Sequence, residues 1–219
     1  MKYWIIDAAG GRSFAADHAL RTGAVTNIED ANVVIVTGAQ SHTTSFEHWK
    51  DKTAVLIELG TECLGVHTGE NNGDEGSNLL GFARFQLGSD EGTNLIELVR
   101  QPRSSDAAIE AAKQIFEAAG MQVAICGDFP GRIIDRLVRP YYNAALRRLD
   151  EGLGTASDLD KTLRLGLGYP RGPIELLERT GLEHHFDVTQ ALFEAYGDPA
   201  YAPARRARVA KQRSALKLK

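Results

Sequence analysis

The sequence predicts an α/β domain built on a parallel sheet, followed by an all-α domain. Short apolar runs separated by turn residues occupy the first half of the 219-residue chain, whereas apolar residues at helical spacing occupy the second half. An apolar content of 43% and a charged content of 25% are typical of globular proteins, and the length is enough for one large or two small cores. We therefore expect residues 1–126 to form the α/β domain and residues 127–219 to form the helical domain.

The strand candidates of the first half are short and contain few polar residues. Such runs are typical of strands that are buried on both faces of a parallel sheet. A helix is expected between the last two of them, because apolar residues recur at helical spacing over Asp106–Ala119, after capping candidates at Ser104 and Ser105 and before Gly120. The candidate strands are Lys2–Ile6, Asn32–Thr37, Ala54–Leu59, Leu95–Val99 and Gln122–Cys126.

The second half contains no convincing strand. Apolar residues at helical spacing predict a long helix over Ile133–Leu149 and a shorter one over Thr155–Leu165. A turn rich in Gly and Pro at Gly166–Pro173 separates these helices from two more, over Ile174–Thr180 and Phe186–Tyr196. The tail, residues 205–219, holds seven Lys and Arg and no acid, and we expect it to be a solvated final helix.

Composition excludes several classes of protein. No apolar stretch approaches the roughly 20 residues of a membrane span, and the apolar start is too short for a signal peptide. Two cysteines, Cys63 and Cys126, cannot make a disulfide framework or a zinc cluster, which favours the cytoplasm. The net charge of −4 argues against nucleic-acid binding. The acids of residues 68–78 lack calcium-loop spacing, so we expect a surface loop there and no metal.

A dinucleotide site is not predicted at the start of the chain. Gly10 and Gly11 follow the first candidate strand, but the third glycine that lets the helix pack on the strand is missing. Arg12 and Phe14 stand where a close approach to a pyrophosphate needs small residues. No acid follows the next strand at Thr37 to hold a ribose hydroxyl.

The second half resembles a known family. The run Asp128–Leu137, read as DFPGRIIDRL, is similar to the D-x-P-G-F-x-x-N-R-L motif that opens the C-terminal domain of 3-hydroxyacyl-CoA dehydrogenases. The resemblance continues through Pro140–Ala145, Glu151-Gly152 and Asp158–Asp160. Its most specific block, Gly166–Leu177, resembles the family's G-x-G-x-P-x-G-P-x-x-L pattern. Upstream, Asn94–Pro102 is similar to the family's L-V-E-V-I-x-x-P stretch.

This resemblance implies a fold and an activity. The family has an N-terminal Rossmann domain that holds NAD and a C-terminal helical domain that dimerises and helps to bind the acyl chain. The short first half looks like a reduced Rossmann-like domain. The implied reaction is oxidation of a secondary alcohol, in which a His removes the hydroxyl proton, a Glu orients that His, and Ser and Asn bind the substrate oxygen.

Carried over to this sequence, the family's site is incomplete. Glu97 stands at the position of the orienting Glu, and Thr61 is the one residue of the Gly60-Thr61 turn that keeps a hydroxyl in place of the Ser. The motif Asn is replaced by Asp135. The base His is absent, because its slot holds Ala83, Arg84 or Phe85, depending on the alignment. Arg cannot act as a base at neutral pH.

Simpler structural roles compete with these assignments. Glu97 could be a strand-edge carboxylate paired with Arg100 or Arg84, and Asp135 could pair along its helix with Arg132 or Arg139. If the family geometry is kept, Glu97 and Asp135 lie close together and share a proton. We expect no other residue to replace the base: the remaining candidates are expected to be surface or capping histidines, at His42, His48, His67, His184 and His185.

Three functions follow from the sequence. The first is a 3-hydroxyacyl-CoA dehydrogenase homologue with impaired or lost NAD-dependent activity, which forms a homodimer through its helical domain, binds acyl-CoA or pairs with a complete dehydrogenase. The second is an active 3-hydroxyacyl-CoA (3-hydroxybutyryl-CoA) dehydrogenase with an altered site, and NAD is expected as a cofactor in this case alone. The third, a nucleic-acid or membrane-binding module, rests on the basic tail alone.

Overall fold

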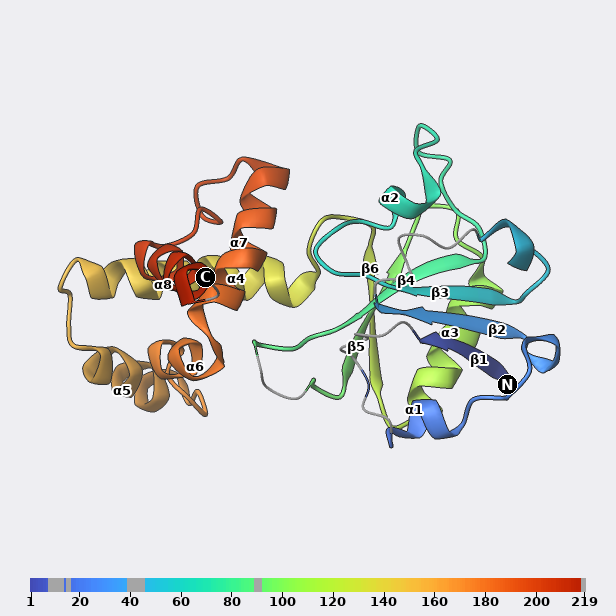
Figure 1. Cartoon of the computed structure of the whole chain (residues 1–219), viewed down its shortest axis with the longest axis horizontal. Helices are drawn as coiled ribbons and strands as arrows, with labels where there is room; N and C mark the ends of the chain where they lie inside the picture. The colour runs from blue at the N-terminus through green and yellow to red at the C-terminus, as the bar shows by residue number, and fades with distance from the viewer. Residues whose placement is uncertain (8–13, 15–16, 39–45, 89–91, 218–219) are drawn as a thin grey trace. The chain divides into compact units, whose positions relative to one another are not determined.

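The computed structural model describes residues 1–7, 14, 17–38, 46–88 and 92–217. The chain divides into two units, each with its own packing (Figure 1). The sheet unit comprises Met1–Phe85 and Gly92–Arg132, and the helical unit comprises Gln86–Glu91 and Ile133–Lys219. The division falls after Arg132, a few residues beyond the boundary expected after Cys126, because residues 128–132 bind a loop of the sheet unit, as described below.

The sheet has six strands in the order β1-β2-β3-β4-β5-β6. Every neighbouring pair is parallel except β4 and β5, which are antiparallel, so the expected parallel sheet is confirmed as a parallel-dominated one. In the doubly wound Rossmann order the first strand lies inside the sheet, whereas here β1 lies at an edge. The strands are β1 (Tyr3–Asp7), β2 (Val33–Thr37), β3 (Ala54–Glu58), β4 (Leu79–Arg84), β5 (Leu95–Arg100) and β6 (Gln122–Gly127).

Strand β4 was not expected from the sequence. Its residues, Leu-Leu-Gly-Phe-Ala-Arg, include no β-branched side chain, and a glycine inside a strand usually weakens it. Packing explains the glycine: a Cβ atom at Gly81 would lie 2.3 Å from a methyl carbon of Leu59 and 3.1 Å from the Cβ of Val99. Tertiary contacts therefore outweigh the low strand propensity of this segment.

Apolar side chains cover both faces of the sheet. Helix α3 (Asp106–Ala118) packs on one face, where its Phe116 lies 5.2 Å from the ring of Phe82 on β4. On the other face, Val55, Ile57 and Val99 pack with Leu64, which immediately precedes the short helix α2 (Gly65–Thr68). The expected burial on two faces is confirmed for β2, β3, β4 and β5, whereas the edge strands β1 and β6 are only partly buried. The described residues of this unit also form α1 (Ala19–Thr22) and two short 3-10 helices, Ile28–Asp30 and Glu47–Trp49.

The helical unit contains the helices that the spacing predicted. The helix expected over Phe186–Tyr196 begins earlier in the structure, at Leu182. The basic tail forms a regular helix. Within the described residues, no helix is long and apolar enough to span a membrane. The helices are α4 (Ile133–Asp150), α5 (Ala156–Leu167), α6 (Pro173–Thr180), α7 (Leu182–Tyr196) and α8 (Arg205–Lys217).

A buried aspartate organises the turn between α5 and α6. The Asp160 carboxylate accepts hydrogen bonds from the backbone N–H groups of Ile174 (2.9 Å) and Glu175 (2.8 Å). These groups lie in the first turn of α6, where the helix itself provides no acceptor for them. Pro173 occupies the first turn of α6, where a missing N–H costs nothing. A Cβ atom at Gly172 would lie 2.2 Å from the Asp160 side chain. The aspartate cap therefore requires a glycine at position 172, and it is compatible with Pro173.

Candidate functional site

Glu97 lies on an interior strand of the sheet. Its neighbours across β4 and β6 are Ala83 and Ala124, which share its face of the sheet. Glu97 is 2% exposed, and β5 has a partner strand on each side. The alternative of a strand-edge carboxylate is therefore wrong. A carboxylate in this position is costly to bury unless it is well bonded, which distinguishes Glu97 from an incidental surface acid.

The register of β4 and β5 shows which residue lies opposite Glu97. Ala83 pairs directly with Glu97, whereas Arg84 pairs with Ile96 and points to the other face. The Arg84 guanidinium donates to the backbone carbonyls of Thr93 (2.5 Å) and Gly92 (2.8 Å), and Phe85 follows the end of the strand. Of the three residues that the alignment allowed, Ala83 is the one beside the Glu97 carboxylate.

Cys126 belongs to the same face, two residues along β6 from Ala124. Burial raises the pKa of its thiol to about 11, and the Glu97 carboxylate adds to the increase, while Arg132 opposes it. The thiol is therefore protonated at neutral pH and is a poor nucleophile. Cys63 and Cys126 are both unpaired and partly buried.

Thr61 lies in a loop that Arg132 holds in place. One terminal nitrogen of Arg132 donates to the backbone carbonyls of Gly60 (2.6 Å) and Glu62 (2.8 Å), on either side of Thr61. The Thr61 carbonyl accepts the N–H of Gly131 (2.6 Å). Arg132 is 2% exposed, although the family motif has Phe at its position. The sequence could not show that this guanidinium binds a loop distant in the chain.

Asp128 fixes the other end of the same loop. Its carboxylate accepts the backbone N–H groups of Leu64 (2.5 Å) and Gly65 (2.8 Å), at the start of α2. The side chain of Gln101 adds a third hydrogen bond at 3.1 Å. Asp128 is the first residue of the motif that resembles the family, and in this chain its carboxylate accepts hydrogen bonds from backbone N–H groups. Together, Asp128 and Arg132 hold the loop that carries Thr61.

Asp135 lies in the helical unit, in the first turn of α4. It accepts a hydrogen bond from the Nε of Arg139 at 2.7 Å, so the ion pair expected along the helix is present. Glu97 and Thr61 belong to the sheet unit, whereas Asp135 belongs to the helical unit. That Glu97 and Asp135 share a proton stays a prediction.

The Asp135–Arg139 pair continues into a buried network that includes His185. A terminal nitrogen of Arg139 lies 3.3 Å from Nδ1 of His185, and Nε2 of His185 lies 3.0 Å from the side-chain oxygen of Asn143. The amide nitrogen of Asn143 donates to the carbonyls of Ala200 and Tyr201, so its oxygen accepts from Nε2. Burial first, and Arg139 second, lower the pKa of His185 to about 3. His185 is therefore neutral.

The expectation of surface histidines is only partly confirmed. His48 and His184 are exposed, but His185 is 1% exposed, and the expectation is wrong for it because α7 turns this side chain into the core of the helical unit. It is wrong for His67 too, whose almost fully covered ring has Nε2 3.6 Å from a carboxylate oxygen of Glu62. His42 lies outside the described residues.

Charged side chains occupy the carboxyl ends of the first strands, where doubly wound sheets bind nucleotides. Arg21 makes a bidentate ion pair with Asp7 at 2.5 and 3.0 Å, and Thr37 donates to Asp7 at 2.8 Å. These bonds to Arg21 and Thr37 hold the pKa of Asp7 below its ordinary value. Glu58 accepts the N–H of Gly38. Two carboxylates at this edge do not fit a pyrophosphate; Gly10, Gly11 and Arg12 lie outside the described residues.

The basic helix α8 is largely bonded to its own unit. Arg205 and Arg206 both bind Asp150, and Lys211 binds Asp187 at 2.7 Å. The guanidinium of Arg208 stacks 5.5 Å from the ring centre of Phe186. Most described basic side chains of this helix therefore have internal partners, which weakens the hypothesis of a nucleic-acid or membrane-binding tail.

The fold is a parallel-dominated sheet unit followed along the chain by a helical unit. Residues 131–217 match the family described as 3-hydroxyacyl-CoA dehydrogenase, C-terminal domain. This part of the chain therefore has the C-terminal domain of the 3-hydroxyacyl-CoA dehydrogenase family. The family expected from the sequence motifs is thereby confirmed.

Relatives match over part of their length. The 3-hydroxybutyryl-CoA dehydrogenase of Bradyrhizobium diazoefficiens is 38% identical over 100 residues, which are 46% of this chain and 34% of that protein. The human mitochondrial hydroxyacyl-coenzyme A dehydrogenase is 38% identical over 82 residues, which are 37% of this chain and 26% of that protein. The matched region thus spans about a third or less of these relatives.

Solved structures share the fold over most of this chain. The (S)-3-hydroxybutyryl-CoA dehydrogenase of Ralstonia eutropha superimposes with a TM-score of 0.68 at 21% identity, covering 84% of this chain and 66% of that one. The 3-hydroxybutyryl-CoA dehydrogenase of Escherichia coli K12 gives 0.69 at 24% identity, covering 84% of this chain and 41% of that one. At these identities the similarity establishes the fold.

Proposed function

We propose that this chain is a 3-hydroxyacyl-CoA dehydrogenase homologue whose NAD-dependent activity is impaired and whose role is accessory. The observation that carries the proposal is the residue opposite Glu97. The family resemblance predicts a His beside the orienting Glu, and the register puts Ala83 there. Alanine has no group that can accept a proton.

The expected loss of rate is large. A positioned acid–base group is typically worth about 10²–10⁴-fold in rate. Asp135 replaces the motif Asn, so a negatively charged carboxylate stands where the family has a neutral amide. This carboxylate is already paired with Arg139. Thr61 keeps a hydroxyl, but a hydroxyl cannot replace the base.

The sheet also supports weak cofactor binding. Its strand order runs from β1 to β6 without a reversal, whereas dinucleotides bind at the point where the order of strands reverses. Asp7 and Glu58 add negative charge at the carboxyl ends of β1 and β3, which disfavours a pyrophosphate there. No cofactor-binding residue is assigned.

The accessory role would use the helical unit. Leu137, Leu165 and Leu167 are 71%, 79% and 63% exposed, and large apolar side chains on helices of a soluble domain favour association. A homodimer is the simplest assembly, and a complete dehydrogenase or an acyl-CoA are the other proposed partners. The two unpaired cysteines favour a cytoplasmic site of action.

The alternative is an active 3-hydroxyacyl-CoA dehydrogenase that acts on CH–OH with NAD as acceptor. The burial of Glu97 at the expected position favours this alternative, because burying a carboxylate costs free energy that only a functional role would offset. This alternative requires another group to accept the proton.

The test is a titration of the full chain with NADH and with acetoacetyl-CoA, with binding followed by calorimetry and turnover by NADH absorbance. We expect acetoacetyl-CoA to bind without measurable turnover. A83H, and the double variant with D135N, restore the residues of the family motifs and should raise turnover if cofactor binding persists. Turnover by the unaltered chain would overturn the proposal, and absence of CoA-ester binding would leave dimerisation alone.

A further inference from the structure

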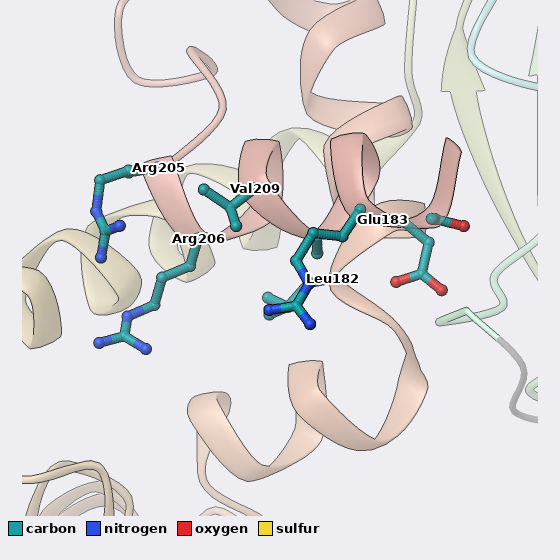
Figure 2. A pocket seen from close by; sticks show the side chains of 8 residues that line it. Leu182, Glu183, Arg205, Arg206 and Val209 are labelled. Atoms are coloured by element: carbon teal, nitrogen blue, oxygen red, sulfur yellow. The ribbon is translucent and has the colours of Figure 1, made fainter. Parts of the chain in front are cut away.

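The helical unit contains a basic cavity that plays no part in the proposed function. It has a volume of about 470 Å³ and is lined by residues at the start of α7 and along α8 (Figure 2). Leu182, Val209 and Ala210 form its apolar part. Its polar lining comes from Glu183, Arg205, Arg206, Arg213 and Ser214.

The arginines of this cavity keep hydrogen-bond donors available. Arg205 uses its Nε and one terminal nitrogen on Asp150, while Arg206 uses only its Nε, at 2.8 Å. Among the described residues, no ion pair or hydrogen bond involves Arg213, which is exposed. The terminal nitrogens of Arg206 and the whole guanidinium of Arg213 therefore remain available at the wall of the cavity.

The charge of the lining is positive. Three arginines face one carboxylate, Glu183, and the single carboxylate of Asp150 serves two of the arginines. Guanidinium groups present several N–H donors in a planar fork that matches the oxygens of phosphate. The Ser214 hydroxyl can donate from the same side of α8, one residue from Arg213.

We propose that this cavity binds a phosphate-bearing small molecule, with the phosphate at Arg206 and Arg213 and an apolar or aromatic moiety on Leu182 and Val209. A nucleic acid would need a continuous basic surface, and Arg208 and Lys211, on the same helix, are engaged with Phe186 and Asp187. The inference concerns a site separate from Glu97 and does not depend on the proposed function.

The experiment is calorimetric titration of the full chain with ADP, adenosine and inorganic phosphate in 0.1 M salt. We expect saturable one-to-one binding of ADP, at least tenfold weaker binding of adenosine, and weak competition by phosphate. R213M should weaken ADP binding at least tenfold. S214D, which puts a carboxylate beside the arginines, should do the same without removing any arginine.

R164M is the matched control, because Arg164 is an exposed arginine of α5 in the same unit and does not line the cavity. It should leave ADP binding unchanged. Equal losses in R164M and R213M would show general charge attraction and overturn the inference, as would equal binding of adenosine and ADP or no saturable binding of ADP. A single-stranded RNA that binds more tightly than ADP and loses affinity in R164M would favour the surface hypothesis instead.

Discussion

An aspartate distant in the sequence caps the start of a helix in each unit, but the two caps differ in what they hold. In the helical unit, Asp160 accepts hydrogen bonds from the N–H groups of Ile174 and Glu175. Its side chain is almost fully buried and packs against Gly172. In the sheet unit, Asp128 accepts the N–H groups of Leu64 and Gly65. Asp160 serves an eight-residue helix, whereas Asp128 serves the four residues of α2 and the loop before them.

The comparison shows what the family motifs mean in this chain. Both aspartates lie in motifs that reveal the family, and both bind backbone amides that would otherwise lack partners. Motif residues of the helical unit therefore secure its packing. In the sheet unit, the same kind of bond positions the loop that carries Thr61.

Replacing Gly172 with Ala should have the largest effect. The new Cβ would lie 2.2 Å from Asp160, so the cap and the α5–α6 turn must separate. Overpacking and loss of the cap together should cost about 3 kcal/mol of the free energy of unfolding. Urea unfolding followed by circular dichroism measures this. G166A is the control: nothing lies near its Cβ, and Ala in α5 should stabilise the chain by about 0.5 kcal/mol.

Replacing Arg132 with Met tests the hydrogen bonds that hold the loop of Thr61 in the sheet unit. The carbonyls of Gly60 and Glu62 would lose their shared charged donor, and a hydrogen bond to a charged group typically contributes about 1.5–3 kcal/mol to the free energy of unfolding. We expect a loss of about 2–3 kcal/mol and faster proteolysis of the 60–65 loop. R103M removes an exposed ion pair with Asp74 and should change stability by less than about 0.5 kcal/mol. Equal effects would contradict the assigned role of Arg132.

His185 should make the helical unit sensitive to acid. Its folded pKa of about 3 lies below the ordinary value of 6.5, so the unfolded chain binds a proton that the folded chain does not between these values. Stability is therefore complete above about pH 6.5 and falls as the pH drops towards 3. Between pH 7.5 and 5 the expected loss is about 2 kcal/mol. H185Q should flatten this dependence, whereas H184Q, at the exposed neighbour, should leave it unchanged.

Replacing Asp128 with Asn should have the smallest effect. The amide oxygen can still accept one backbone N–H, so the expected loss of stability is about 1 kcal/mol. The local consequence is larger: amide hydrogen exchange should accelerate at Leu64 and Gly65 and remain unchanged at Ile174. D160N should reverse this pattern, with faster exchange at Ile174 and Glu175. If both variants changed exchange in both units, the two caps would not be independent.

Much of the helical unit was predictable, and the reason is local. Periodicity predicted α4 at Ile133–Leu149 and the structure ends it one residue later, because the spacing of apolar residues on a helix is a property of neighbouring positions. The pairing of Asp135 with Arg139 was foreseen as one of two options for the same reason. The burial of His185 was not foreseen, because its partner Asn143 comes from another helix.

The sequence by itself determined the two-part order, the helices and the family, because each is encoded in residue types at short, regular spacing. Only the tertiary structure decided that Ala83 lies opposite Glu97 and that Asp128 and Arg132 hold the loop of Thr61. These contacts join segments that are distant along the chain. Packing across the whole sheet unit determines the register of the strands and which carbonyls the Arg132 guanidinium binds. Neither can be predicted from a local sequence pattern.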